Sequence, residues 1–231
     1  MATSKCSQAG QQLWAKMPKV GGYTRLCFAW SVIGFLVHTN SSYRITHQAN
    51  AELFALTYGS LVTELVRDHE DPIEVNKQLD KIGKSIGVRC VDEFLAKADV
   101  AGLGLASQCQ SLRDTAEVVA RMGFRMFLGV GAECGAFSQD QKSFSIYFHD
   151  NPLSTFVELP PAGDDQMGDD LRKLKYSNIY CGIIRGALEQ VNLKVDVTLV
   201  QCTLKGDEVN EIRVELKEVL ADGAGDDYKE E

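Results

Sequence analysis

The segment CQSLRDTAEVVARMGFRMFLG, residues 109–129, decides the fold of this 231-residue chain, because most of its length predicts a single helix. Ser111, with Asp114 three residues later, has the pattern of a capping box that fixes the start of that helix. The charged residues share one stripe, which consists of Asp114, Glu117, Arg121 and Arg125. The other faces carry Val118, Val119, Met122, Phe124, Met126, Phe127 and Leu128. A helix that is apolar over most of its circumference is expected to be buried on several sides.

Two residues of this segment need an explanation beyond helix formation. Gly123 lies inside the predicted helix, where glycine costs about 1 kcal/mol relative to alanine. We interpret that cost as a need for space beside the backbone, either for another helix or for a ligand. Cys109 lies in a loop before the helix, and the pattern alone also allows a core helix with an unmodified cysteine nearby.

The composition is typical of a soluble globular protein. Hydrophobic residues make up 45% of the chain and charged residues 24%, and the length allows a full core without disulfides. The net charge is −8, and no basic run stands out that could neutralise a phosphate backbone. We therefore predict no nucleic-acid partner.

The cysteines and histidines form no pattern of a metal or catalytic site. Seven cysteines stand at positions 6, 27, 90, 109, 134, 181 and 202, an odd number with wide gaps. Such spacing fits neither a disulfide framework nor a zinc site, and it favours free thiols in the cytosol. The histidines, at positions 38, 47, 69 and 149, form no metal-binding pair and no triad. We predict no metal and no catalytic residues.

Residues 1–49 differ from the rest of the chain and are interpreted as an atypical extension. Their apolar stretch Leu26–Val37 (LCFAWSVIGFLV) is too short for a membrane span, which needs about 20 residues. Basic residues precede it as in a signal peptide, but no clear cleavage site follows, so we favour an extension over a signal or anchor. At the other end, residues 221–231 are predicted to be an acidic, mobile tail.

Residues 50–220 are predicted to form one α+β domain, with helices first and then strands with a helix between them. Asn50 is the expected N-cap of the first helix, and Asp71-Pro72-Ile73-Glu74 resembles a capping box at the start of the second. After the helix within residues 109–129, a further helix follows from Tyr176 to Val191, with Arg185 and Glu189 expected as a pair on its outer face. Glycines four residues apart allow close approach of a neighbour in two helices, at Gly83 and Gly87 and at Gly182 and Gly186.

Alternating apolar and polar residues predict the strands of an antiparallel sheet. The pattern indicates a half-buried strand at residues 144–148 and another short strand at residues 156–159. Residues 195–199 and 212–216 alternate on either side of a turn at Lys205-Gly206-Asp207, which is a strong hairpin signal.

The body contains several distinctive segments, in this order: NAELFALTYGSLVTEL, EVNKQLDKIGKSIGVR, VDEFLAKADV, RDTAEVVARMGFRMFLGV, NPLSTFVELP, YSNIYCGIIRGALEQV and TLKGD. Together they resemble the trafficking protein particle (TRAPP) complex subunit 3 family. The resemblance implies an α+β fold, helices packed on an antiparallel sheet, and a hydrophobic channel in the core. It also implies a non-enzymatic core scaffold, whose complex tethers vesicles in ER-to-Golgi transport and exchanges guanine nucleotides on a Rab-family GTPase.

The resemblance also implies partners and a location. We expect other TRAPP subunits to bind through helical faces, and the GTPase to be contacted through the complex, with the tail 221–231 reaching toward it. The protein is expected in the cytoplasm, at the periphery of cis-Golgi and endoplasmic reticulum membranes. The alternatives are a lipid- or small-ligand-binding module and, more remotely, a thiol-dependent enzyme that uses Cys109.

By the same resemblance, Cys109 is the attachment point of a covalently bound palmitate or similar acyl chain, because it stands four residues before the arginine of RDTAEVVA. Gly123 matches a small residue beside the acyl channel, and Val119, Met122 and Met126 lie within one turn of it. The chain departs from the family pattern at residues 101–108, which lengthen the loop before the cysteine, and at residues 21–49. The second segment is interpreted as a retained intron or a lineage-specific insertion.

Overall fold

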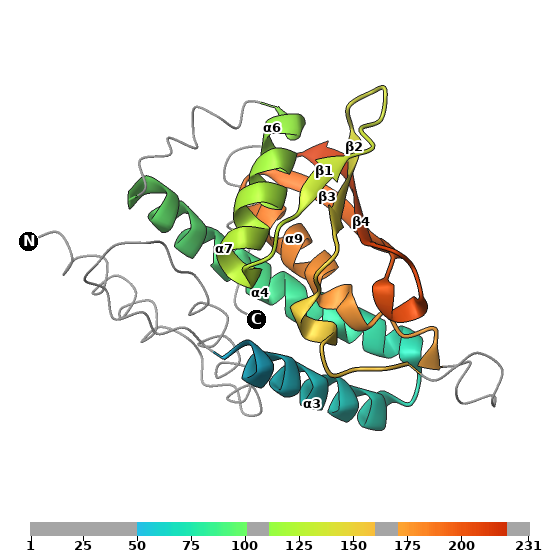
Figure 1. Cartoon of the computed structure of the whole chain (residues 1–231). Helices are drawn as coiled ribbons and strands as arrows, with labels where there is room; N and C mark the ends of the chain where they lie inside the picture. Colours follow the sequence, from blue (N-terminus) through green and yellow to red (C-terminus); the bar gives the residue numbers. More distant parts are fainter. Residues whose placement is uncertain (1–49, 101–110, 160–170, 221–231) are drawn as a thin grey trace, which may run out of the picture.

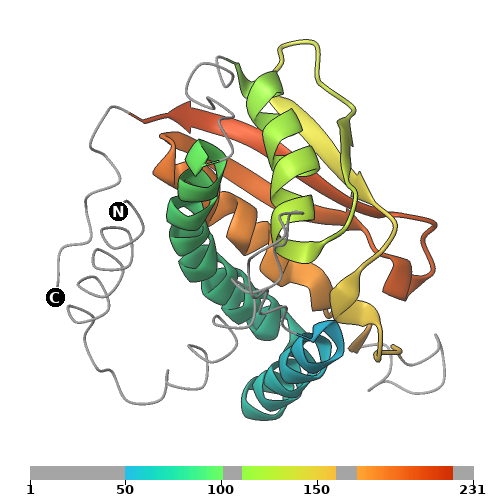
Figure 2. The same ribbon diagram turned by 60° about the vertical axis from the view of Figure 1, so that its left-hand side comes forward.

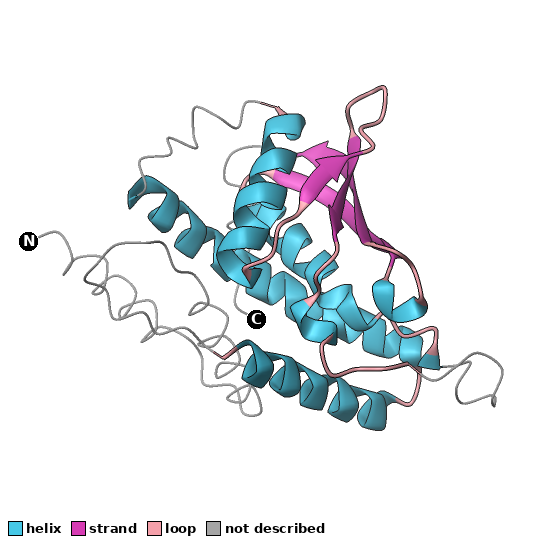
Figure 3. Ribbon diagram, viewed as in Figure 1, coloured by secondary structure: helices cyan, strands magenta, loops and turns pink. Residues whose placement is uncertain are grey.

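The fold is that of helices packed on a four-stranded antiparallel sheet, which confirms the predicted α+β class (Figures 1 and 3). The computed structural model describes residues 50–100, 111–159 and 171–220. The predicted extension 1–49, the predicted attachment residue Cys109 and the predicted tail 221–231 lie outside the described residues. In the parts of the chain that the structure describes, no helix is both long and apolar enough to cross a bilayer.

Helices α3, α4 and α9 contribute to the helical layer of the molecule. Helix α3 spans Ala51–His69, α4 spans Pro72–Val100, and α9 spans Ile179–Gln190 after a 3-10 turn, η3, at Tyr176–Asn178. Asn50 is the N-cap of α3 as predicted, because its Oδ1 accepts hydrogen bonds from the backbone of the first turn.

The start of α4 is capped on one side only. The Asp71 carboxylate accepts from the Ile73 backbone N–H at 2.9 Å, but the Glu74 side chain bonds to Lys77 and Gln78. The predicted reciprocal arm of the capping box is therefore wrong, since Lys77 and Gln78 lie one turn ahead and offer donors to the carboxylate.

Helices α4 and α9 cross at the distance of backbone contact, as the paired glycines predicted. A Cβ atom built on any of the four glycines would lie 2.0–2.2 Å from a carbonyl oxygen of the other helix. The positions are Gly83 and Gly87 in α4 and Gly182 and Gly186 in α9. Real side chains do not approach backbone so closely, so glycine is required at each position for this crossing.

Salt bridges connect the two crossing helices at the side of the glycines. Arg185 pairs with Asp80 of α4 and also donates to the Val197 carbonyl oxygen at 3.1 Å. Glu189 pairs with Lys84 of α4 at 2.6 Å. The prediction that Arg185 and Glu189 pair with each other is therefore wrong, because the close crossing brings oppositely charged residues of α4 within reach of both.

The sheet has the order β1-β2-β4-β3, and all neighbours are antiparallel. Strand β1 spans Glu133–Gly135, β2 spans Ser143–Phe148, β3 spans Leu193–Gln201 and β4 spans Asn210–Val219. The predicted hairpin is confirmed as β3 and β4, which are joined by the 3-10 turn η4, Thr203–Lys205. Gly206 then adopts φ +97°, a left-handed conformation that favours glycine.

Two strand predictions need correction. Residues 156–159 are not a strand, because the chain turns after β2 into the 3-10 helix η2 at Pro152–Ser154, and the Val157 N–H bonds back to Ser154. Strand β2 is buried on both faces rather than half-buried. Ser145 on its outer face is fully buried, and its hydroxyl donates to the Glu211 carboxylate at 2.6 Å.

A pair of tyrosines joins α3 to η3 and gives a first prediction. The Tyr58 hydroxyl donates to the Tyr176 carbonyl oxygen, whereas the buried Tyr176 hydroxyl has no hydrogen-bond partner among the described residues. Burial raises the pKa of Tyr176 to about 12. A buried unsatisfied polar group costs about 1–3 kcal/mol, so we expect Tyr176→Phe to raise the free energy of unfolding by about 1 kcal/mol.

The matched variant is Tyr58→Phe, which removes a hydrogen bond and should lower the free energy of unfolding by about 1–2 kcal/mol. Urea unfolding of the two variants and the wild type measures both changes. Equal destabilisation by the two substitutions would mean that the Tyr176 hydroxyl has a partner after all.

Candidate functional site

The candidate site is built on the helix that the sequence singled out. It consists of α6 (Leu112–Glu117), a π-helical turn η1 (Val118–Gly123) and α7 (Phe124–Leu128), which follow one another without a break (Figure 1). The predicted capping box at its start is confirmed, because Ser111 and Asp114 exchange backbone-to-side-chain hydrogen bonds. Gly129 ends the helix with φ +72°.

The π-helical turn was not predicted. The Phe124 N–H donates to the carbonyl oxygen of Val119, five residues earlier, instead of to the residue four positions before it. This adds one residue to the turn, so the side chains after it point in different directions from those of a regular α-helix. Such turns occur frequently at functional sites. Here the turn contains Val119, Met122 and Gly123, three of the four predicted channel residues.

One face of this helix packs against the body. Its buried residues are Ala116, Ala120 and Phe124, spaced four apart. Phe124 contacts Phe148 of β2 and Tyr180 of α9, with ring centroids 5.1 and 6.3 Å apart. The helix therefore lies on the same side of the sheet as α4 and α9 (Figure 2).

The other apolar residues of the helix are half-buried, so the predicted burial on several sides is met only in part. These residues are Leu112, Val118, Val119, Met122, Met126, Phe127 and Leu128. Ala116 and Ala120 are fully buried, whereas the half-buried residues keep partial exposure to solvent even where they pack against the core, as Val119 does. We call the half-buried residues Val119, Met122 and Met126 the apolar strip.

Gly123 lies beside this strip and has open space next to it. A Cβ atom built there would meet only the Val118 carbonyl oxygen within 4 Å, at 4.0 Å. This differs from the four glycines of the α4–α9 crossing, which touch backbone. The sequence left two explanations for Gly123, close approach of another helix or space for a ligand. Among the described residues, no other helix approaches Gly123 closely. Space for a ligand remains.

The described cysteines are placed for packing rather than for chemistry. Cys90, Cys134, Cys181 and Cys202 are free thiols, and burial raises the pKa of Cys90 and of Cys181 to about 12. A thiol with a raised pKa is a poor nucleophile. Within residues 50–100, 111–159 and 171–220, no group of three or more His, Cys, Asp or Glu side chains is placed to hold a metal ion.

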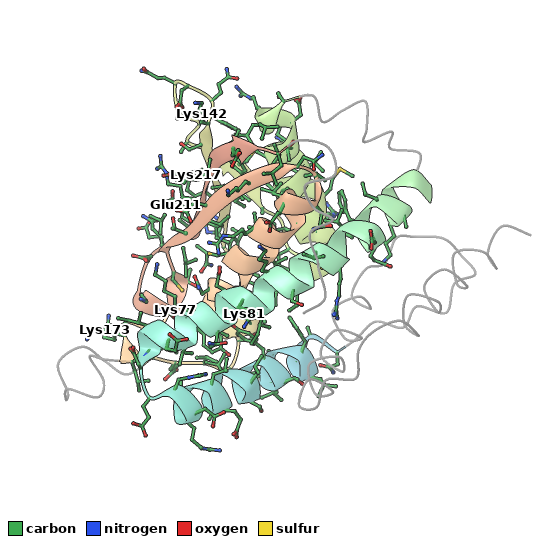
Figure 4. The ribbon with its side chains drawn as sticks, turned by 180° about the vertical axis from the view of Figure 1, so that it is seen from behind. Lys77, Lys81, Lys142, Lys173, Glu211 and Lys217 are labelled. Carbon is green, nitrogen blue, oxygen red and sulfur yellow. The ribbon has the colours of Figure 1, made fainter. Side chains whose placement is uncertain are left out.

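A second surface of interest is the outer side of the helical layer. Figure 4 shows this side, with α3 beside the part of α4 that carries Lys77 and Lys81. Leu53 and Leu56 of α3 are 53% and 54% exposed, whereas Phe54, Ala55, Tyr58 and Val62 face the core. Residues three apart on a helix are neighbours, so the two leucines form one apolar surface. Sequence reasoning had named helical faces without locating this one.

Comparison with known proteins agrees with these features. Residues 54–215 match the family model described as transport protein particle (TRAPP) component. The chain is 48% identical to trafficking protein particle complex subunit 3 of Dictyostelium discoideum over 183 residues, which cover 79% of this chain and 91% of the relative. It is 43% identical to transport protein particle subunit bet3 of Schizosaccharomyces pombe, with 77% and 90% covered.

A solved structure is similar as well. The crystal structure of a trafficking protein particle complex subunit 3 from Naegleria fowleri, covalently bound to palmitic acid, matches with a TM-score of 0.67. The two chains share 46% identity, and the match covers 75% of this chain and 98% of the other. The chain described here belongs to the TRAPP component family, in the group of the complex subunit 3 and Bet3 proteins.

Proposed function

We propose that the protein is a non-enzymatic core scaffold subunit of a TRAPP vesicle-tethering complex, and that it carries a buried acyl chain attached to Cys109. The main support is the palmitic acid bound covalently in the similar solved structure, together with the apolar strip and the open space beside Gly123. The complex would act in ER-to-Golgi transport, at the periphery of endoplasmic reticulum and cis-Golgi membranes.

The apolar strip has the chemistry that an acyl chain needs. Val119, Met122 and Met126 keep exposed apolar surface, and methionine side chains adapt to irregular ligands. Cys109 is two residues before Ser111, so backbone geometry limits the distance between their Cα atoms to about 7 Å. A chain attached there could run along the helix from its start. Burial contributes about 0.8 kcal/mol per CH₂ group, so the chain would act as part of the core.

As a scaffold, the protein would bind partner subunits through its helical layer. The surface of Leu53 and Leu56 on α3 is the exposed helical face that best fits another subunit, because it is apolar and lies at the outer side of the layer. In the assembled complex, partner subunits would stabilise the nucleotide-free form of a Rab-family GTPase and so release GDP. This chain would hold that assembly in place rather than carry out a reaction.

Co-purification tests the scaffold role. We expect the tagged chain to recover other TRAPP subunits from its own cells, and Leu53→Asp to reduce that recovery at least about tenfold, because it places a charge in an apolar interface. The control is Val200→Asp on β3, where the side chain is 52% exposed. Failure of the wild-type chain to recover any TRAPP subunit contradicts the proposed function, whereas unchanged recovery with Leu53→Asp contradicts only the docking face.

A lipid- or small-ligand-binding module is the second candidate, and the partial exposure of the apolar strip favours it. The two differ in how the lipid is held. A scaffold of this family would hold its acyl chain through a covalent bond, whereas a carrier would hold a lipid that exchanges with added lipid.

A further inference from the structure

The outward face of α3 carries few charges over its first three turns. No charged residue occurs between Glu52 and Glu64, although the outer side of a surface helix normally carries charges. The hydroxyls on this part of α3 are also satisfied within the helix. Thr57 donates to the Leu53 carbonyl oxygen at 2.7 Å, and Ser60 donates to the Leu56 carbonyl oxygen at 3.0 Å. What this face offers to a neighbour is therefore mainly the two exposed leucines.

The chain itself contains a segment that would fit this face. Leu26–Val37 has 12 residues with a single hydroxyl side chain and no charge. Such a stretch is too short to cross a bilayer, yet exposing its apolar side chains to water is unfavourable. It therefore needs an apolar surface to cover it.

The connection between the two is short. Thirteen residues, 38–50, separate Val37 from Ala51, the first residue of α3. For thirteen residues, the random-coil relation gives a root-mean-square span of about 20 Å, which is similar to the length of the first three to four turns of α3. A tether of this kind gives an effective concentration in the millimolar range. Even a weak apolar contact between the segment and α3 would then be populated.

We propose that Leu26–Val37 docks in cis on the face of α3 that is formed by Leu53 and Leu56. The docking depends only on residues of this chain. A consequence that rests on the proposed function is competition, because the segment covers the same face that a partner subunit would use. The extension then lowers the affinity for that partner, and the partner displaces the segment when it binds.

The tryptophans of the chain provide a specific probe. The sequence has two tryptophans, Trp14 and Trp30, and both lie in the extension, so the body from residue 50 onward contributes no tryptophan signal. In the full-length Trp14→Phe variant, all tryptophan fluorescence comes from Trp30 inside the apolar segment. We expect its emission to be blue-shifted relative to tryptophan in water and protected from acrylamide quenching.

Substitution of the docking face should reverse this result. Leu53→Asp with Leu56→Asp, in the Trp14→Phe background, should shift Trp30 emission to that of exposed tryptophan, because each lost leucine contact lowers the docking constant about tenfold. Val200→Asp, which changes an equally exposed apolar residue on β3, should leave the emission unchanged. Circular dichroism of each variant checks that the body remains folded.

Two outcomes overturn the proposal. One is a water-exposed Trp30 in the purified chain, and a blue shift that then appears only when phosphatidylcholine vesicles are added would assign the segment to membranes. The other is a buried Trp30 whose emission does not respond to the α3 substitutions. Both measurements use the purified chain without partner subunits, so their result is independent of the co-purification that tests the proposed function.

Discussion

Gly87→Ala is expected to lower the free energy of unfolding of this protein by about 2–3 kcal/mol, although alanine is the better helix former. The added Cβ would lie 2.0 Å from the Ile183 carbonyl oxygen and 2.8 Å from the Ala187 nitrogen. Both contacts are to backbone, so no side chain can rotate away and α4 and α9 must separate. That movement also weakens the pairing of Arg185 with Asp80 and of Lys84 with Glu189.

Thermal unfolding measures this effect directly. For a domain of this size, a loss of 2–3 kcal/mol lowers the Tm by about 5–10 °C. The matched control is Gly123→Ala, which changes a helical glycine whose Cβ would meet nothing closer than 4.0 Å. Alanine there should stabilise the helix by up to about 1 kcal/mol. Glycine-to-alanine substitution is thus expected to lower the free energy of unfolding at Gly87 and to raise it at Gly123. Equal effects at both positions would refute the close crossing of α4 and α9.

The glycine spacing shows what the sequence could predict of the fold. Two pairs of glycines four residues apart indicated close helix contacts, and the structure brings the two pairs together. The sequence did not show that α4 and α9 are each other's partners, so Arg185 was assigned to Glu189 instead of Asp80. Side-chain pairs within a helix can be predicted from the spacing of residues in the sequence. Pairs between helices depend on the crossing angle, which that spacing does not determine.

The candidate site was predictable only in part. The helical periodicity around Gly123 located the helix, and the family resemblance supplied Cys109 as the attachment point. The π-helical turn at Val118–Gly123 could not be foreseen, because periodicity analysis assumes one constant angle per residue. Strand β1 was missed for a related reason, since three residues are too few to show alternation. The exposure of the apolar strip also escaped prediction, because apolar residues were taken to mean burial.

Acylation of Cys109 gives the prediction with the largest expected effect. Intact-mass measurement of the protein purified from eukaryotic cells should show the increment of one long acyl chain, and Cys109→Ser should remove that increment completely. The burial of a long chain at about 0.8 kcal/mol per CH₂ has an upper limit on the order of 10 kcal/mol. Loss of the chain should therefore lower the Tm of the Cys109→Ser variant clearly relative to the wild type. An increment that persists in Cys109→Ser contradicts the attachment point, and one that exchanges with added lipid supports a ligand-binding module.

Substitutions of Gly123 test whether the acyl chain attached to Cys109 also occupies a channel beside this glycine. We expect Gly123→Ala to keep the acyl chain, because one methyl group fits the open space at this position. Gly123→Leu fills that space with a branched side chain, and overpacking of this kind costs about 1–3 kcal/mol, enough to lower the acylated fraction about tenfold. Normal acylation of the leucine variant would remove Gly123 from the channel wall while leaving Cys109 in place. Alanine and leucine are both good helix formers, so helix propensity does not distinguish the two variants, and their comparison tests the size of the side chain at this position. Circular dichroism of the leucine variant checks that the body remains folded.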